Sequence, residues 1–196
     1  MDAAEELILD RGFAGTTVEA IIERAGITKG TFFYHFDTKA DLARAIVRRY
    51  AELDADHLRT NMAAAEERSD DPLEQVLHFV RLFERDMEDL TEPYPGCLFA
   101  SYCYQNQLFD PETLEIVEEG LLRWRRLLGE KLGAAMERHA TRRPVDADDL
   151  ADMLLVAFEG GLVVSKTLEE PDSVANQLAL YRTFLETLFE EDGAGG

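Results

Sequence analysis

Polar side chains suited to nucleic acid contact are grouped in one short segment near the start of the chain. Two hydroxyls, an ammonium and a glycine occupy residues 28–31, and Tyr34 and His35 follow one helical turn later. Hydroxyl and ammonium groups at a helix N-terminus can reach phosphates and base edges, and Thr31 also offers a methyl group to thymine. The pattern predicts that a short helix contacts DNA with its first turn.

The abundant carboxylates raise a different hypothesis, a helical metalloenzyme. A di-iron bundle needs inward-facing Glu-x-x-His pairs, and none of the four histidines has Glu three residues before it. The nearest approach is Asp54 with His57, which has no second pair. The sequence has no phosphate loop, nucleophile elbow or zinc spacing. We therefore expect no catalytic residue, no metal site and no cofactor.

Two short helices joined by a glycine-containing turn must position the polar segment. Gly12 is expected to end a first helix, and Thr16 to open a second one through a capping box with Glu19. That second helix ends near Gly26, and a third helix covers about 29–35 with a threonine cap. Short helices with a tight turn between them are typical of a helix-turn-helix, whose second helix enters the major groove.

The charge distribution agrees with a DNA-binding N-terminal end. The chain has a net charge of −20, yet residues 1–50 carry eight acidic and seven basic residues. Six of those bases lie between Arg24 and Arg49, together with only two acids. An acidic remainder would repel DNA and help to orient the basic end toward it.

The stretch from Gly12 to Leu42 resembles the TetR family of repressors. The matching residues are Gly12-Phe13, Thr16-Thr17-Val18, Ile21, Ala25-Gly26-Ile27, Lys29-Gly30-Thr31, Phe33-Tyr34-His35-Phe36 and Thr38-Lys39-Ala40-Asp41-Leu42. The resemblance implies a three-helix DNA-binding head, a C-terminal core that binds a small molecule, and a dimer formed by the last two helices.

Specific DNA contacts are carried over from this resemblance, position by position. Together with the helix cap Thr28, the residues expected to touch DNA are Thr17, Lys29, Gly30, Thr31, Phe33, Tyr34, His35 and Lys39. Phe33 departs from the family, which usually has tyrosine there. Phenylalanine keeps the packing of that ring but lacks the hydroxyl that bonds phosphate.

Caps and breakers divide the whole chain into about nine helices, so we expect an all-α protein. Asp71-Pro72 and Asp110-Pro111 each combine a capping carboxylate with a proline in the first helical turn. An apolar helix is expected over 97–109. We predict a helix-turn-helix domain at 1–48 and a ligand-binding and dimerisation domain at 49–192.

Aromatic and apolar stripes in the later helices are candidates for a small-molecule site. Such stripes more often belong to an ordinary core, but aromatic residues with polar groups also suit a partly apolar ligand. The residues predicted to contact the ligand are Phe79, Phe83, Met87, Tyr102, Leu121, Trp124 and Leu128.

The resemblance implies that helices at about 147–168 and 173–190 form the homodimer interface. Gly160-Gly161 lies inside the first of these, where each glycine costs about 1 kcal/mol of helix stability, which close helix packing could justify. Packing within one subunit is the alternative for each side chain in the interface set. That set is Met153, Val156, Phe158, Leu162, Leu180, Phe184 and Leu188.

Two further expectations concern chemistry and location. Cys97 and Cys103 are interpreted as buried structural thiols and not as a redox pair, because six helical residues separate them by about 9 Å. The sequence has no membrane-length apolar run and no basic leader, so we expect a cytoplasmic protein.

The predicted function is that of a ligand-responsive transcriptional regulator. A repressor that a small molecule releases from a palindromic operator is the primary hypothesis, with activation as the other possible outcome. The strong acidity and short first helix leave one alternative, an acidic helical binding module without DNA-binding activity.

Overall fold

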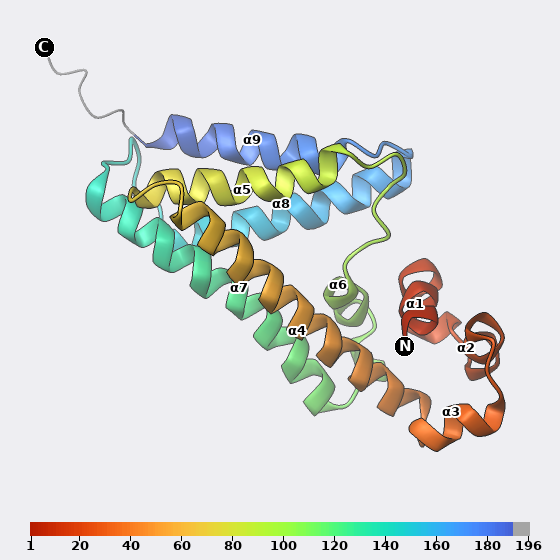
Figure 1. The fold of residues 1–196 in the computed structure, drawn as a ribbon. Helices are drawn as coiled ribbons and strands as arrows, with labels where there is room; N and C mark the ends of the chain where they lie inside the picture. Colours follow the sequence, from red (N-terminus) through yellow and green to blue (C-terminus); the bar gives the residue numbers. More distant parts are fainter. Residues whose placement is uncertain (190–196) are drawn as a thin grey trace, which may run out of the picture. The chain divides into compact units, whose positions relative to one another are not determined.

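A computed structural model describes residues 1–189 of the chain, and this part is all-α, as expected (Figure 1). It contains nine α-helices and one 3₁₀ helix. They are α1 (Asp2–Gly15), α2 (Val18–Ala25), α3 (Lys29–His35), α4 (Lys39–Glu66), α5 (Pro72–Glu88), α6 (Leu98–Cys103), η1 (Asn106–Leu108), α7 (Pro111–Arg138), α8 (Ala147–Leu168) and α9 (Ser173–Leu188). The predicted extensions of the last domain and last helix past residue 189 lie outside the described residues.

These helices form two compact units. The first unit combines residues 1–55 with 95–121, and the second combines 56–94 with the described chain from 122 onward. The boundaries fall inside α4 and α7, so each of these two helices contributes to both units. The division at residue 48 that the sequence suggested stays a prediction.

In the first unit, α1 packs against α2 and α6. The first half of α4 supplies the centre of this core, where Ala43, Ile46 and Val47 have no exposed surface. Tyr102 of α6 is also fully buried, and its hydroxyl donates a 2.7 Å hydrogen bond to the backbone carbonyl of Ala43. A buried phenol needs such a partner, so this bond fixes α6 against α4.

The α1 helix breaks at Gly12, as predicted, but the chain turns once more before α2. Gly12 has φ 77° and ψ 165°, a conformation that is nearly exclusive to glycine. The prediction that Thr16 caps α2 with Glu19 was wrong by one residue. Thr17 is the cap and accepts a hydrogen bond from the Ala20 amide. Thr16 is buried instead, and its hydroxyl donates to the Gly12 carbonyl at 2.9 Å.

The sixth predicted helix is shorter than its apolar pattern indicated. The α-helix ends at Cys103, and after one 3₁₀ turn Phe109 is extended. The Phe109 ring stacks on Tyr102 with a centroid distance of 4.2 Å. Asp110 then accepts a hydrogen bond from the Thr113 amide and so begins α7. The stacking and this cap both require the chain to leave the helical path before residue 109.

In the second unit, α9 packs against both α5 and α8, and the three helices lie side by side in Figure 1. Gly161 allows a close approach, since a Cβ added there would lie 3.0 Å from the Cα of Val174 on α9. The buried carboxylate of Glu84 on α5 accepts hydrogen bonds from Arg81 and from Arg182 of α9. Pairing on both sides compensates the loss of water around this charge.

Candidate nucleic-acid interface

The first turn of α3 is held by its own threonines. Thr28 caps the helix, because its hydroxyl accepts a hydrogen bond from the Thr31 amide at 3.1 Å. The two threonine hydroxyls also lie 2.9 Å apart and share a hydrogen bond. Gly26, with φ 65°, turns the chain from α2 toward this cap. Phe32 is buried and anchors α3 from beneath.

Anchoring Phe32 leaves the other side of α3 in solvent. Tyr34 is 84% exposed, and its ring meets His35 edge to face at 5.0 Å. The ammonium of Lys29 lies 5.8 Å from the Phe33 ring centroid. The structure gathers on this exposed surface seven of the nine predicted DNA contacts: Thr28, Lys29, Gly30, Thr31, Phe33, Tyr34 and His35. Thr17 is exposed at the start of α2.

Lys39, the ninth predicted contact, has a partner inside the protein. Its ammonium donates a hydrogen bond to the carbonyl of Phe13 and lies 3.8 Å from the centroid of the same ring. The side chain is partly buried, and burial lowers the pKa of the ammonium. A contact of Lys39 with DNA phosphate would compete with these interactions.

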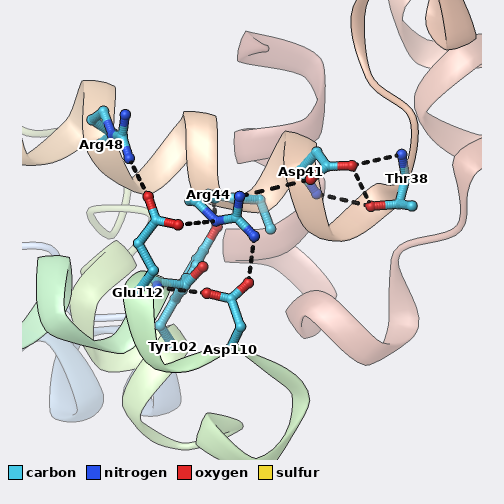
Figure 2. Close-up of polar contacts among 9 residues, drawn as sticks. Thr38, Asp41, Arg44, Arg48, Tyr102, Asp110 and Glu112 are labelled. Carbon is cyan, nitrogen blue, oxygen red and sulfur yellow. Dashed lines mark hydrogen bonds and ion pairs between the residues drawn. The ribbon is translucent and has the colours of Figure 1, made fainter.

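Most of the basic residues between 24 and 49 are paired with acids from other elements. Arg24 bonds Glu6 at 2.7 Å, and Arg49 bonds Glu5 at 2.7 Å. Arg48 forms an ion pair with Glu112, in the first turn of α7, at 2.8 Å (Figure 2). The local excess of positive charge in the sequence is therefore largely neutralised in the folded unit. Residue spacing within the segment carries no signal for these distant partners.

Arg44 lies at the centre of this network, between Asp110, Glu112 and Asp41 (Figure 2). The hydrogen bond from its guanidinium to Asp110, at 2.6 Å, lowers the pKa of that carboxyl to about 2. Asp41 also accepts hydrogen bonds from the amide and hydroxyl of Thr38, and its own amide donates to Thr38. This reciprocal cap begins α4 directly after α3.

The predicted ligand contacts do not form one group. Tyr102 and Leu121 belong to the first unit, where Tyr102 is part of the core beneath α4. Trp124 belongs to the second unit and lies 5.1 Å from Phe83 and 6.1 Å from Phe79 between ring centroids. The other predicted contacts in that unit, Met87 and Leu128, are buried.

His57 also belongs to this aromatic cluster, although it is not among the ligand contacts predicted from the sequence. Its imidazole lies 4.8 Å from the Phe83 ring and its Nε2 lies 3.4 Å from a carboxylate oxygen of Asp86. The cluster of His57, Phe79, Phe83 and Trp124 thus combines three aromatic rings, two of them buried, with one imidazole. Its members come from α4, α5 and α7, so sequence proximity could not group them.

The helices α8 and α9 present apolar side chains to solvent. Val156 and Leu180 are the most exposed of the predicted interface residues, at 70% and 61%. Met153 and Phe184 are also exposed, and Phe158 is half-buried. Leu162 and Leu188 are buried in their own subunit, so their assignment to a dimer surface was wrong. A built Cβ at Gly160 would have nothing within 4 Å, in contrast to Gly161.

Cys97 is buried, as expected, but Cys103 is exposed. The expectation of two buried thiols was wrong for Cys103, which ends α6 and is exposed like Tyr104 after it, whereas Tyr102 before it faces the core. Among residues 1–189, no three or more His, Cys, Asp or Glu side chains are grouped as a metal ion would require. No helix in the described chain is both long and apolar enough to span a membrane.

Both parts of the chain match known protein families. The family of bacterial regulatory proteins named tetR matches residues 1–46, and the tetracyclin repressor-like C-terminal domain matches residues 72–180. An HTH-type transcriptional regulator from Lactococcus lactis is 20% identical over 97% of this chain and 93% of its own. The repressor DhaR from a Mycobacterium species is 24% identical over 85% of this chain and 80% of its own.

Solved structures share the fold. A TetR-family regulator from Agrobacterium tumefaciens aligns with a TM-score of 0.76 and 20% identity over 96% of this chain and 95% of its own. The regulatory protein TetR from Rhodobacter sphaeroides gives a TM-score of 0.76 and 23% identity, with 96% of each chain covered. At these identities, the likeness establishes the shared arrangement of helices.

Proposed function

The chain belongs to the TetR family of bacterial regulatory proteins, and on that premise we propose that it represses transcription by binding a palindromic operator through α3. In this proposal a small molecule binds the helical core and releases the protein from DNA, inside the cytoplasm. Proteins of this family are transcriptional regulators, and we propose that this one has no catalytic activity of its own.

The observation that carries the proposal is the exposed first turn of α3. Two threonine hydroxyls and the Lys29 ammonium are presented together at the N-terminal end of a helix that Phe32 anchors, and the exposed Tyr34 phenol lies about one turn later. A helix end of this kind fits the major groove, with hydroxyls and ammonium near phosphates and base edges. We propose that Thr17, Gly30, Phe33 and His35 complete this surface.

Two exposed tyrosines provide a matched test. Tyr34 on α3 is 84% exposed, and Tyr104 after α6 is 81% exposed. Fluorescence anisotropy would measure the affinity of wild type, Tyr34→Ala and Tyr104→Ala for DNA sequences that the wild type selects from a random pool. We expect about a tenfold or larger loss of affinity in Tyr34→Ala alone, the effect of losing one good contact in each half-site. Equal affinities of both variants would exclude α3 as the reading element.

Failure of the wild type to select any sequence would favour the alternative function, an acidic helical binding module. Metal analysis of the purified protein tests the remaining class. A stoichiometric transition metal would support a helical metalloenzyme and contradict the proposal.

The ligand site is proposed at the cluster of His57, Phe79, Phe83 and Trp124, together with the buried residues Met87 and Leu128. Aromatic rings with one imidazole suit a small molecule that is mostly apolar and has one polar group. A panel of hydroxylated aromatic compounds would be screened for release of labelled operator. Phe83→Ala should abolish release without changing DNA affinity, whereas Tyr104→Ala should leave release intact. Release that survives in Phe83→Ala would exclude this cluster.

We propose that α8 and α9 form the homodimer interface. The exposed positions Met153, Val156, Gly160 and Val163 follow the spacing of a helix-packing seam, and Leu180 with Phe184 continues it on α9. Leu180 and Leu53 have nearly equal exposure, 61% and 60%, but Leu53 lies on α4. Light scattering should show a dimer for wild type and Leu53→Glu, and a monomer for Leu180→Glu. A dimeric Leu180→Glu protein would contradict this interface.

A further inference from the structure

Side-chain hydrogen bonds converge on the backbone at the junction between α1 and α2, where α1 breaks at Gly12. They involve the carbonyls of Gly12 and Phe13 and the amide of Ala14. The hydroxyl of Thr16 donates to the first carbonyl at 2.9 Å. The Gln105 side chain accepts a 2.9 Å hydrogen bond from the Ala14 amide.

Lys39 is a second hydrogen-bond donor to the Phe13 carbonyl. Its ammonium donates to the Phe13 carbonyl, which also accepts the Thr16 amide, and it lies 3.8 Å from the Phe13 ring centroid. Hydrogen bonding and a cation–π contact with one residue hold this ammonium in place. Lys29 differs, because its side chain is exposed and its ammonium lies 5.8 Å from the nearest ring centroid, that of Phe33.

A continuous set of contacts returns from Phe13 to α4. The ring of Phe13 packs on Phe109 at 4.7 Å, and Phe109 stacks on Tyr102. The Tyr102 hydroxyl donates to the carbonyl of Ala43, one helical turn after Lys39. These contacts therefore connect the α1–α2 junction to α4 at two places: to its first turn through Lys39, and to its second turn through the bond from Tyr102 to Ala43.

We propose that Lys39 is a positioning residue of the DNA-binding head, which fixes the α1–α2 junction on α4, and that it does not neutralise a DNA phosphate. The inference rests on the proposed DNA-binding function. Since α2 begins at Val18, five residues after Phe13, the anchored carbonyl sets the direction in which α2 and then α3 leave α1. Moving the ammonium to a phosphate would break both of its contacts and release that junction.

Salt dependence separates positioning from phosphate contact. Each neutralised phosphate contributes about 0.9 to the slope of log affinity against log salt, so a residue present twice in a dimer contributes about 1.8. Affinity for the selected operator would be measured across salt concentrations for wild type, Lys39→Met and Lys29→Met. We expect at least a tenfold weaker affinity with an unchanged slope for Lys39→Met. Lys29→Met serves as the comparison and should lower the slope by about 1.8.

A second measurement uses the free protein, where DNA has no influence. Hydrogen exchange of a peptide covering residues 12–20 should be faster in Lys39→Met than in wild type, and unchanged in Lys29→Met. Lys39→Arg should restore slow exchange and DNA affinity, because a guanidinium can also donate to the Phe13 carbonyl and lie over the ring. If Lys39→Met does not fold, Lys39→Gln, which keeps a donor without charge, takes its place.

A slope lowered by about 1.8 in Lys39→Met, or unchanged exchange at residues 12–20, would overturn the proposal. Failure of the wild type to bind any DNA would instead refute the proposed function. In that case the exchange measurement still decides whether Lys39 fixes the junction.

Discussion

Replacement of Gly12 by alanine tests whether the break in α1 is built into the backbone. With φ 77° and ψ 165°, Gly12 occupies a region where a residue with a Cβ costs about 1–3 kcal/mol. A Cβ added there would also lie 2.4 Å from Nε2 of Gln105. The Gln105 side chain must move, and loss of its hydrogen bond to the Ala14 amide costs about 0.5–1.5 kcal/mol.

An opposing effect comes from the unfolded chain, which is less flexible with alanine and so favours folding by about 0.4–1 kcal/mol. Together, the three effects predict that Gly12→Ala decreases the free energy of unfolding by about 0.5–4 kcal/mol. Urea denaturation followed by circular dichroism measures it, at one protein concentration because dimer formation affects apparent stability. Gly15→Ala is the matched control, since a Cβ there meets Arg11 only at an ordinary 3.6 Å.

The double variant Gly12→Ala, Gln105→Ala separates the two causes. If backbone strain dominates, Gly12→Ala should cost nearly as much in the Gln105→Ala background as in wild type. Equal stability of Gly12→Ala and Gly15→Ala would refute the argument. If the double variant is as stable as Gln105→Ala alone, crowding by Gln105, and not the φ angle, makes glycine necessary at residue 12.

Two other substitutions test packing and electrostatics. Gly120→Ala should destabilise the protein by about 1–3 kcal/mol relative to Gly133→Ala in the same urea assay. An added Cβ at Gly120 would meet the Phe99 ring at 2.5 Å, whereas Gly133 has nothing within 4 Å; equal effects would contradict this packing. Asp110, whose pKa is lowered to about 2 chiefly by the hydrogen bond from Arg44, should contribute stability above pH 3.8 that is lost as the pH falls toward 2. Asp110→Asn should therefore lower the urea midpoint at pH 7 and flatten the acid side of the profile, and an unchanged profile would show that this ion pair adds nothing.

Local sequence signals predicted the helices well. The bounds of α8 agree with the prediction at both ends, because an acidic cap precedes it and the pattern stops before Pro171. The Thr28 cap and the extent of α3 also agree. Of the neighbouring Thr16 and Thr17, the sequence pattern predicted the wrong one as the cap of α2. Thr16 is buried and its hydroxyl donates to the Gly12 carbonyl, so Thr17 caps the helix.

Interactions between distant segments account for most of what the sequence did not predict. The sequence shows an excess of positive charge close to α3, yet Arg44 and Arg48 form ion pairs with Asp110 and Glu112 at the start of α7. Lys39 matches a position that commonly contacts DNA, but its partner is 26 residues earlier in the chain. Tyr102 resembled the other aromatic candidates in type and spacing. Only the fold assigns it to the core beneath α4.

The position of Trp124 has a practical consequence. It is the single tryptophan of the chain, and its indole lies within about 6 Å of the Phe79 and Phe83 rings and therefore among the proposed ligand contacts. Its emission reports on the second unit, whereas the proposed DNA contacts of α3 belong to the first. Occupancy of the proposed ligand site can thus be followed in unlabelled protein by intrinsic fluorescence, while labelled DNA reports operator binding in the same cuvette. The unlabelled chain therefore provides one of the two fluorescence signals that are needed to measure how effector binding changes operator binding.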